Sequence, residues 1–212
     1  LRTKNRPIAS GQISIKLGIF YALTLCLLAL LVLLNFNYYT IILAFASMPL
    51  AFTYPLMKRF TYWPQLFLGI TFNYGLILGW TSITSEISIV PIIFYFGAIF
   101  WTLGYDTIYG YQDIKDDEII GLKSTSIKFK NNAKQFLLIC YSLVYVFFLA
   151  AGFNMNFSYI YFVVSIIPFL HLFFFQIKKF NLSNSSTCLK IFKSNNIFGL
   201  IVFFNLLIGK LV

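Results

Sequence analysis

The chain has 212 residues, of which 59% are hydrophobic and only 10% are charged. A soluble domain carries about 25% charged residues, so this composition excludes an ordinary soluble domain and favours an integral membrane protein. The net charge of +10 does not indicate nucleic-acid binding, because the basic residues lie in loops between apolar runs, where membrane proteins keep them.

Seven apolar stretches predict membrane-spanning helices, although the second is short and contains Pro49. The predicted fold is therefore all-α, a polytopic transmembrane helix bundle that forms a single domain over residues 1–212. The predicted spans are 15–36, 40–53, 66–84, 89–109, 136–153, 158–176 and 196–211.

The loops between these spans differ in charge. The N-terminal arm and the connections 54–65, 109–135 and 177–195 fall on one side of the membrane, and every Lys and Arg except Lys210 is assigned to that side. The positive-inside rule makes this side cytoplasmic. We therefore expect a protein of the bacterial inner (plasma) membrane whose polar loops meet at the cytoplasmic face.

Three features of the spans are interpreted as structural. Gly75 and Gly79 form a GxxxG pattern, which indicates close helix packing. His171 is a single histidine among phenylalanines, and we expect it to be a packed or hydrogen-bonded residue in preference to a metal ligand. The three cysteines are too widely spaced for a zinc or redox motif.

Negative charge is concentrated in one segment, residues 105–126. Five of the six acidic residues lie there, namely Asp106, Asp113, Asp116, Asp117 and Glu118. If the segment is the end of a helix, Asp106, Asp113 and Asp117 lie within about 40° of one another, at about 100° per residue. Carboxylates grouped at a membrane surface without His or Cys predict a Mg²⁺ site.

Basic residues of the other cytoplasmic loops complement these carboxylates. Mg²⁺ keeps few protein ligands and usually shares its coordination with a substrate phosphate. Arg2 and Arg6 lie in the N-terminal arm, Lys58 lies in the second cytoplasmic loop, and Lys123 follows the aspartates. Cations grouped with a metal site are typical of diphosphate binding. The sequence therefore predicts metal-dependent phosphate chemistry.

Three stretches carry a family resemblance. The motif YDTIYGYQDIKDDEIIGLKST resembles the second aspartate-rich motif of the UbiA superfamily of intramembrane aromatic prenyltransferases, and within it the 4-hydroxybenzoate polyprenyltransferase branch. The loop YPLMKR is similar to the Y-x-x-x-K motif of that family. RTKNRPIASG is similar to the segment that follows the family's first aspartate motif, and the resemblance extends over essentially the whole chain.

The resemblance implies a helical fold of about nine spans around a central cavity, with Mg²⁺ between two aspartate motifs and the diphosphate of a polyprenyl donor. It implies that Asp113 and Asp117 are metal ligands, with Asp116 inside the same motif and Asp106 in the Tyr-Asp pair upstream. The first motif, N-D-x-x-D-x-x-x-D, does not occur in this sequence. We therefore expect a chain that lacks the first two helices and the first aspartate motif.

The remaining site assignments also follow from the resemblance. Lys58 and Tyr54 match the loop that contacts the diphosphate, and Arg2 and Arg6 match the basic residues after the first motif. Lys123 is added to this diphosphate-binding group because it follows the aspartates directly.

The implied reaction is transfer of a polyprenyl group from its diphosphate to 4-hydroxybenzoate, at the ring carbon ortho to the hydroxyl, in ubiquinone biosynthesis. One alternative is a related prenyltransferase with another acceptor, such as a naphthoate or haem. Another is an inactive truncated membrane protein. A transporter is disfavoured, because transporters place charges at mid-membrane and these spans contain almost none. The sequence leaves open the polyprenyl chain length, the acceptor-binding residues and the oligomeric state.

Overall fold

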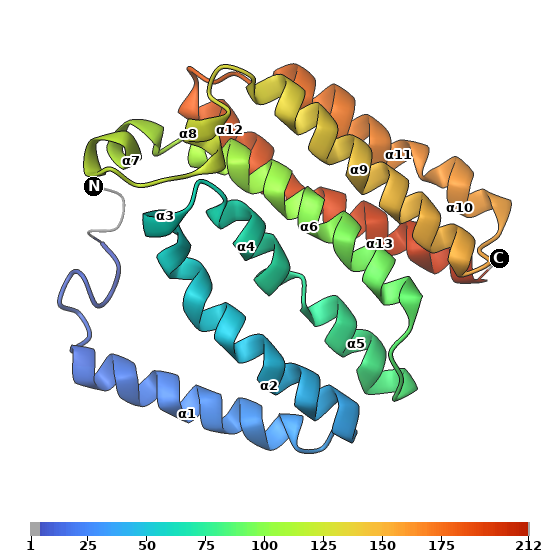
Figure 1. The fold of residues 1–212 in the computed structure, drawn as a ribbon, viewed down its shortest axis with the longest axis horizontal. Helices are drawn as coiled ribbons and strands as arrows, with labels where there is room; N and C mark the ends of the chain where they lie inside the picture. Colours follow the sequence, from blue (N-terminus) through green and yellow to red (C-terminus); the bar gives the residue numbers. More distant parts are fainter. Residues whose placement is uncertain (1–4, 212) are drawn as a thin grey trace.

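The structure is a computed structural model that describes residues 5–211, and this part of the chain contains helices and no strands. The long helices lie roughly side by side in a bundle (Figure 1). The α-helices are α1 (Ile15–Leu33), α2 (Tyr38–Thr53), α3 (Met57–Phe60), α4 (Pro64–Phe72), α5 (Gly75–Thr84), α6 (Ile89–Gly110), α7 (Ile114–Ile120), α8 (Thr125–Lys128), α9 (Ala133–Asn154), α10 (Tyr159–Val164), α11 (Ile166–Leu170), α12 (Ser185–Lys193) and α13 (Asn195–Leu211). Two further turns are η1 (Tyr54–Leu56), a 3₁₀ helix, and η2 (His171–Ile177), a π-helix.

Seven helical stretches in the described residues are long and apolar enough to cross a membrane, which confirms the predicted all-α, seven-span architecture. In lipid every backbone N–H and C=O must be satisfied within the protein, so an apolar chain spans as helices. The stretches are Ile15–Leu33, Tyr38–Phe60, Pro64–Thr84, Ile89–Gly110, Ala133–Asn154, Tyr159–Ile177 and Ser185–Leu211.

The second stretch is longer than the sequence predicted. It continues past Thr53 through η1 and α3 to Phe60, because Pro55 lies at the start of a 3₁₀ turn, where a missing N–H costs little. Lys58 and Arg59 therefore occupy the last turn of a helix and not a loop. Cations are favourable there because the helix C-terminus is negative.

The polar connection predicted over 177–195 is also partly helical. Asn184 caps α12 by accepting a hydrogen bond from the Thr187 N–H at 3.0 Å. The helix buries Cys188 and Ile191 and leads directly into α13. Cys188 and Ile191 form the apolar face of an amphipathic helix, which explains why this segment folds against the bundle. The many polar residues of the segment hid this face in the sequence.

The third stretch is irregular between α4 and α5. The Asn73 side-chain amide donates to the Gly69 carbonyl at 2.9 Å, to the Ala98 carbonyl at 3.1 Å and to Thr102 Oγ1 at 2.7 Å. Asn73 is only 7% exposed. Its side chain therefore supports the helix break and fixes α4 against α6.

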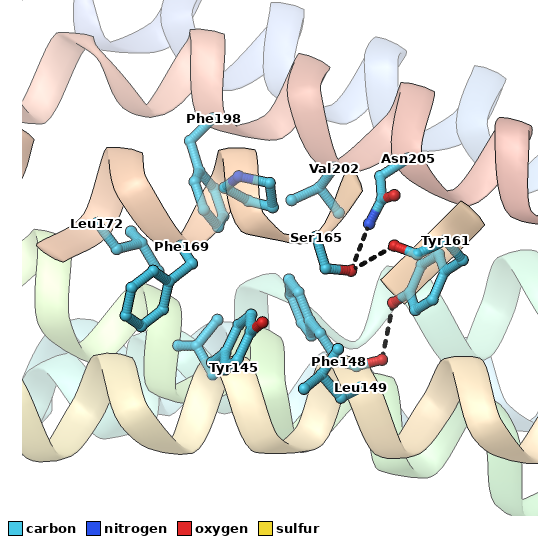
Figure 2. A pocket seen from close by; sticks show the side chains of 12 residues that line it. Tyr145, Phe148, Leu149, Tyr161, Ser165, Phe169, Leu172, Phe198, Val202 and Asn205 are labelled. Atoms are coloured by element: carbon cyan, nitrogen blue, oxygen red, sulfur yellow. Dashed lines mark hydrogen bonds between the residues drawn. The ribbon is translucent and has the colours of Figure 1, made fainter. Parts of the chain in front are cut away.

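Hydrogen bonds join three helices around a small space of about 10 Å³. The Asn205 amide of α13 donates to Ser165 Oγ at 2.9 Å, and Ser165 Oγ donates to the Tyr161 carbonyl at 2.8 Å (Figure 2). The Tyr161 hydroxyl donates to the Phe148 carbonyl of α9 at 2.7 Å. Polar contacts of this kind hold spans together where lipid provides no hydrophobic drive.

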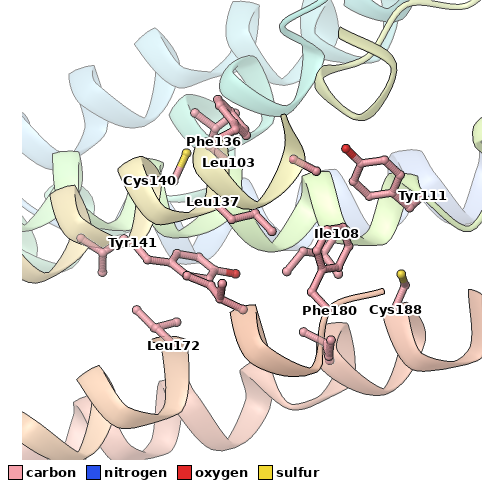
Figure 3. Packing of buried hydrophobic residues seen from close by; sticks show 14 of the residues in the cluster. Leu103, Ile108, Tyr111, Phe136, Leu137, Cys140, Tyr141, Leu172, Phe180 and Cys188 are labelled. Carbon is pink, nitrogen blue, oxygen red and sulfur yellow. The ribbon is translucent and has the colours of Figure 1, made fainter. Parts of the chain in front are cut away.

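The main apolar core lies between α6, α9, η2 and the α12–α13 stretch (Figure 3). Leu137 and Ile108 are fully buried in it, and α6 makes its most extensive contact with α9. A Cβ added at Gly104 would overlap the ring of Tyr141, so the absence of a side chain there lets the two helices approach closely.

A polar chain crosses this core. The Tyr141 hydroxyl donates to Gln176 Oε1 at 2.5 Å, and the Gln176 amide donates to Asn195 Oδ1 at 3.0 Å. The Trp101 indole donates to the same Asn195 oxygen at 2.8 Å. His171 stacks on Phe175, with ring centroids 5.2 Å apart, which agrees with the expectation of a packed histidine.

We expect Gly104→Ala to lower the free energy of unfolding by about 1–3 kcal/mol, the usual cost of overpacking. The Tyr141 ring cannot move aside easily, because it is completely buried and its hydroxyl is bonded to Gln176. Denaturant or thermal unfolding in detergent measures the change. Gly199→Ala is the matched control, since its Cβ would meet only Trp101 at 3.7 Å. Equal stability of the two variants would contradict this account of the α6–α9 contact.

Candidate functional site

A polar cleft of about 350 Å³ lies at one end of the bundle, beside α3, α7 and the end of α6. Charged residues from four separate segments line it together with aromatic and apolar neighbours. The lining consists of Arg6, Tyr54, Pro55, Lys58, Pro64, Gln65, Leu68, Asp106, Tyr109, Gly110, Asp113 and Asp117. The cleft therefore combines three of the predicted aspartates with three of the predicted diphosphate-binding residues.

The aspartates reach the cleft by a route that the sequence did not predict. The interpretation of the segment as one helix end is wrong, because α6 ends at Gly110 and α7 begins at Ile114. Asp113 lies at the N-terminal boundary of α7, and its N–H donates to the Gly110 carbonyl at 3.3 Å. Asp113 and Asp117 thus belong to a separate short helix that folds back toward Asp106.

A buried set of hydrogen bonds holds this fold-back in place. Thr107 Oγ1 on α6 is 2.6 Å from Thr125 Oγ1, and Ser126 Oγ donates to the Thr107 carbonyl at 2.8 Å. The Thr125 N–H donates to Gln65 Oε1 on α4 at 3.0 Å. Thr107, Thr125 and Ser126 are all 0% exposed. Thr125 and Ser126, at the end of the motif, therefore anchor the loop that follows α7.

Lys58 is positioned from the same loop. Its backbone carbonyl accepts a hydrogen bond from the Lys123 N–H at 2.8 Å, which ties the end of α3 to the segment after α7. The Lys123 ammonium donates to the Phe60 carbonyl at 3.3 Å. Lys123 is not among the residues that line the cleft, so in this structure it holds two segments together.

The other predicted site residues are distributed as follows. Arg6 and Tyr54 line the cleft, whereas Asp116 does not. Arg2 lies outside the described residues. Glu118, which was not predicted as a ligand, forms a salt bridge with Lys130 at 2.7 Å on the surface.

The carboxylates crowd one another electrostatically. Partial burial raises the pKa of Asp117, Lys58 lowers it, and the neighbouring carboxylates Asp113 and Asp116 raise it further. The net direction is upward, so Lys58 does not fully compensate the negative charge around Asp117. An additional cation in the cleft would favour the ionised form of these aspartates.

The donor set fits a Mg²⁺ ion that is completed by substrate. Among the described residues, no three or more His, Cys, Asp or Glu side chains are grouped closely enough to hold a metal by themselves. Mg²⁺ is commonly bound by one or two carboxylates together with waters and substrate phosphates. Asp113 and Asp117 meet that requirement, and Lys58 beside them suits the same phosphate.

Sequence reasoning missed several cleft residues. Gln65 is 3% exposed and accepts a hydrogen bond from the Thr125 N–H, so it supports the loop after α7. In the sequence, a single amide side chain at the start of an apolar span could have indicated such a role. Tyr109 lines the cleft and packs on Phe192, with ring centroids 4.3 Å apart. The sequence shows Tyr109 within the YDTIY motif. It does not show the contact with Phe192, which lies 83 positions later in the chain.

Comparison with known proteins decides the family. The model of the UbiA prenyltransferase family matches residues 1–207. This chain belongs to that family. The assignment agrees with the resemblance carried by the aspartate-rich and YPLMKR motifs, and it covers all of the cleft residues.

Curated relatives of this UbiA family member have been named for a specific reaction. The chain is 42% identical over 212 residues to the mitochondrial 4-hydroxybenzoate polyprenyltransferase of Rattus norvegicus, matching 99% of this chain and 56% of the relative. It is 40% identical over 212 residues to the mitochondrial enzyme of the same name in Arabidopsis thaliana, matching 99% of this chain and 51% of the relative. The chain therefore spans about half the length of the curated relatives it matches.

Solved structures support the fold. The apo structure of a UbiA homologue from Aeropyrum pernix K1 matches with a TM-score of 0.79 at 21% identity, over 99% of this chain and 78% of that chain. A structure of digeranylgeranylglyceryl phosphate synthase matches with a TM-score of 0.70 at 18% identity, over 99% of this chain and 75% of that chain. These UbiA-type structures share the helical membrane architecture of the present chain.

Proposed function

We propose that the complete protein containing this chain transfers a polyprenyl group from polyprenyl diphosphate to 4-hydroxybenzoate, in ubiquinone biosynthesis. The observation that carries the proposal is the cleft in which Asp113 and Asp117 lie with Lys58 and Arg6 at the polar end of an apolar bundle. A substrate with an anionic head and a long apolar tail fits that division between charge and hydrocarbon. The names of the relatives support the choice of reaction.

The basic residues bind the leaving group in this proposal. Lys58 and Arg6 donate charge-assisted hydrogen bonds to the diphosphate oxygens, and the Tyr54 hydroxyl contributes a neutral donor. Negative charge accumulates on the diphosphate as its bond to the allylic carbon breaks. Fixed cations at that position stabilise the transition state more than the ground state.

Asp113 and Asp117 hold Mg²⁺ in this proposal, with Asp116 next to them and Asp106 on the adjacent face of the cleft. When bound, Mg²⁺ supplies Lewis-acid stabilisation of the diphosphate leaving group. The support for this role is that Asp113 and Asp117 line one cleft with Lys58, where burial and neighbouring carboxylates raise the pKa of Asp117.

The bonds change as follows. The carbon–oxygen bond of the donor breaks, and its electron pair leaves with the diphosphate. The ring carbon ortho to the hydroxyl of 4-hydroxybenzoate then forms a bond to the allylic carbon, and its proton passes to water. The Tyr109 ring, held against Phe192, is an aromatic face in the cleft that suits a developing allylic cation.

The proposal allows two membranes for this protein, one mitochondrial and one bacterial. The described spans make the protein integral to a membrane. The relatives are named as mitochondrial proteins, which does not favour the bacterial inner membrane expected from the sequence. We propose that the cleft faces the compartment that retains the basic loops, which is the matrix in mitochondria and the cytoplasm in bacteria.

The choice of acceptor is tested by a panel assay. Membranes that contain the complete protein are incubated with Mg²⁺, a polyprenyl diphosphate and one of three acceptors: 4-hydroxybenzoate, a hydroxynaphthoate or haem. We expect prenylated product with 4-hydroxybenzoate alone, and loss of that product when a chelator removes Mg²⁺. Exclusive use of either other acceptor would replace this proposal with a sister reaction.

We expect Asp113→Ala and Asp117→Ala to lower turnover by about 10²-fold or more, because each removes charge stabilisation from the reacting diphosphate. Glu118→Ala is the matched control, since it removes the same charge from α7 at a residue that pairs with Lys130 on the surface. All three variants should insert and unfold like the parent. Parental turnover by Asp113→Ala or Asp117→Ala would refute a metal-binding role for that residue.

We expect Lys58→Ala to raise the KM for the donor by about tenfold, the equivalent of one charge-assisted hydrogen bond. The KM for 4-hydroxybenzoate should change little. Lys115→Ala provides the control, because Lys115 is exposed on α7 and does not line the cleft. An unchanged donor KM in Lys58→Ala would remove Lys58 from the diphosphate-binding group.

A further inference from the structure

A basic pocket of about 480 Å³ lies where α9 begins and η2 ends, and we call it the lysine pocket. Lys134 is in the first turn of α9, Lys178 and Lys179 directly follow η2, and residues 180–183 complete the wall. None of these residues lines the cleft that contains the aspartates. Three ammonium groups in one concavity attract an anion more strongly than lysines that are spread over a surface.

The chain provides no carboxylate to neutralise this pocket. Residues 119–212 contain no Asp or Glu. The last acidic residue of the sequence, Glu118, pairs with Lys130 at 2.7 Å, and within the described residues no salt bridge involves a lysine of the pocket. The positive-inside rule gathers lysines on one side of a membrane, but it does not require three of them to share one concavity. We therefore look for the complementary anion outside the chain.

The loop that closes the pocket is fixed to the rest of the protein. Phe180 is buried in the main core and packs on Tyr111, with ring centroids 5.3 Å apart (Figure 3). Asn181 Oδ1 accepts a hydrogen bond from the Ser183 N–H at 3.0 Å, and the Asn181 carbonyl accepts one from the Asn184 N–H at 3.2 Å. These contacts give the wall one shape without any ligand.

The positions of two of the lysines are also restrained. The Lys179 ammonium lies 4.2 Å from the centre of the Phe175 ring, a contact that holds the side chain without neutralising its charge. Lys134 is carried by α9, which packs against η2. The pocket therefore brings together charges from two neighbouring helices.

The pocket lies at the boundary between apolar spans and polar connections. Ala133–Asn154 and Tyr159–Ile177 are both long and apolar enough to cross a membrane, and the lysines lie at the start of the first stretch and just after the second. Ends of spans lie at the level of the lipid headgroups. An anion that reaches this pocket is therefore at the height of a phospholipid phosphate.

Exposed apolar side chains continue from the lysines into the spans. Leu138 is one helical turn beyond Lys134 on the same face of α9, and it is exposed. Phe174, four positions before Lys178, is also exposed. A ligand with an anionic head and hydrocarbon chains matches this arrangement, because its head meets the lysines and its chains meet Leu138 and Phe174.

We propose that the lysine pocket binds the phosphate headgroup of an anionic membrane phospholipid. The three ammonium groups donate charge-assisted hydrogen bonds to the phosphate oxygens, and basic pockets between spans are typical sites for such headgroups. A phospholipid is assigned in preference to free phosphate because of the exposed apolar side chains below the lysines. The proposal is independent of prenyl transfer, since the lysine pocket and the aspartate cleft share no residue.

Lipid titration tests the proposal without requiring turnover. The chain in detergent micelles is titrated with a fluorescent phosphatidylglycerol, and with a phosphatidylcholine that carries the same acyl chains and label. We expect the unsubstituted chain to prefer phosphatidylglycerol. Combined Lys134→Gln, Lys178→Gln and Lys179→Gln should weaken phosphatidylglycerol binding by about tenfold or more, because each lysine near the headgroup contributes to the attraction. Binding of phosphatidylcholine should stay as it is in the unsubstituted chain.

A second triple variant makes the result specific. Combined Lys115→Gln, Lys190→Gln and Lys193→Gln removes the same charge from exposed positions on α7 and α12 that do not line the pocket. It should keep the parental affinity for phosphatidylglycerol within about twofold. The substituted lysines are all exposed, so both variants should unfold at the parental temperature. Lys178→Gln alone should weaken binding in the same direction by a smaller factor.

Three results would overturn the proposal. Parental binding of phosphatidylglycerol by the pocket variant would show that these lysines do not hold the lipid. An equal loss in both triple variants would show that net charge, and not the pocket, attracts it. Inorganic phosphate provides the third test: displacement of the bound lipid by inorganic phosphate at equal concentration would assign the pocket to free phosphate, whereas we expect the lipid to stay bound.

Discussion

The site depends on the buried attachment of residues 121–126 to α6 and α4. Thr107, Thr125 and Gln65 form this attachment: the two threonine hydroxyl oxygens are 2.6 Å apart, and the Thr125 N–H donates to Gln65 Oε1 at 3.0 Å. A buried polar group without a partner is costly, so these groups fix one position for the loop. That position brings Asp113 and Asp117 to the same cleft as Asp106 of α6.

The division of the bundle into a charged end and an apolar end has a simple physical origin. Lipid tolerates neither unpaired charges nor unsatisfied backbone groups, so ionisable residues collect where the spans meet water. Among the described residues, Asp106 lies on a spanning helix only four residues before its end at Gly110. The same constraint leaves a cavity of about 550 Å³ between α5, α6, α9 and α13 lined by uncharged residues.

Polar side chains inside the spans stabilise the fold by hydrogen bonds between helices. Asn73 supplies donors at the break between α4 and α5, and Gln176 joins α9 to α13 through Tyr141 and Asn195. These contacts hold the helix faces in register over the distance between the cleft and the cavity. They also show why the spans contain polar amides but almost no charge: an amide can be satisfied by a neighbouring helix, whereas a charge needs a partner and water.

The sequence by itself determined the number and apolar character of the spans, the side that keeps the basic loops, and the family, because hydrophobic length, loop charge and the aspartate motif are local properties. It also identified Lys58, Asp106, Asp113 and Asp117, which the structure brings to one cleft. The tertiary structure decided what depends on contacts between distant segments. The structure shows that Gln65 supports the loop after α7. It also shows that Gly75 and Gly79, the GxxxG glycines, line a cavity and contact no neighbouring helix at their Cβ positions. Spacing within one helix shows which residues share a face, but only the neighbouring helices decide whether that face meets another side chain or open space.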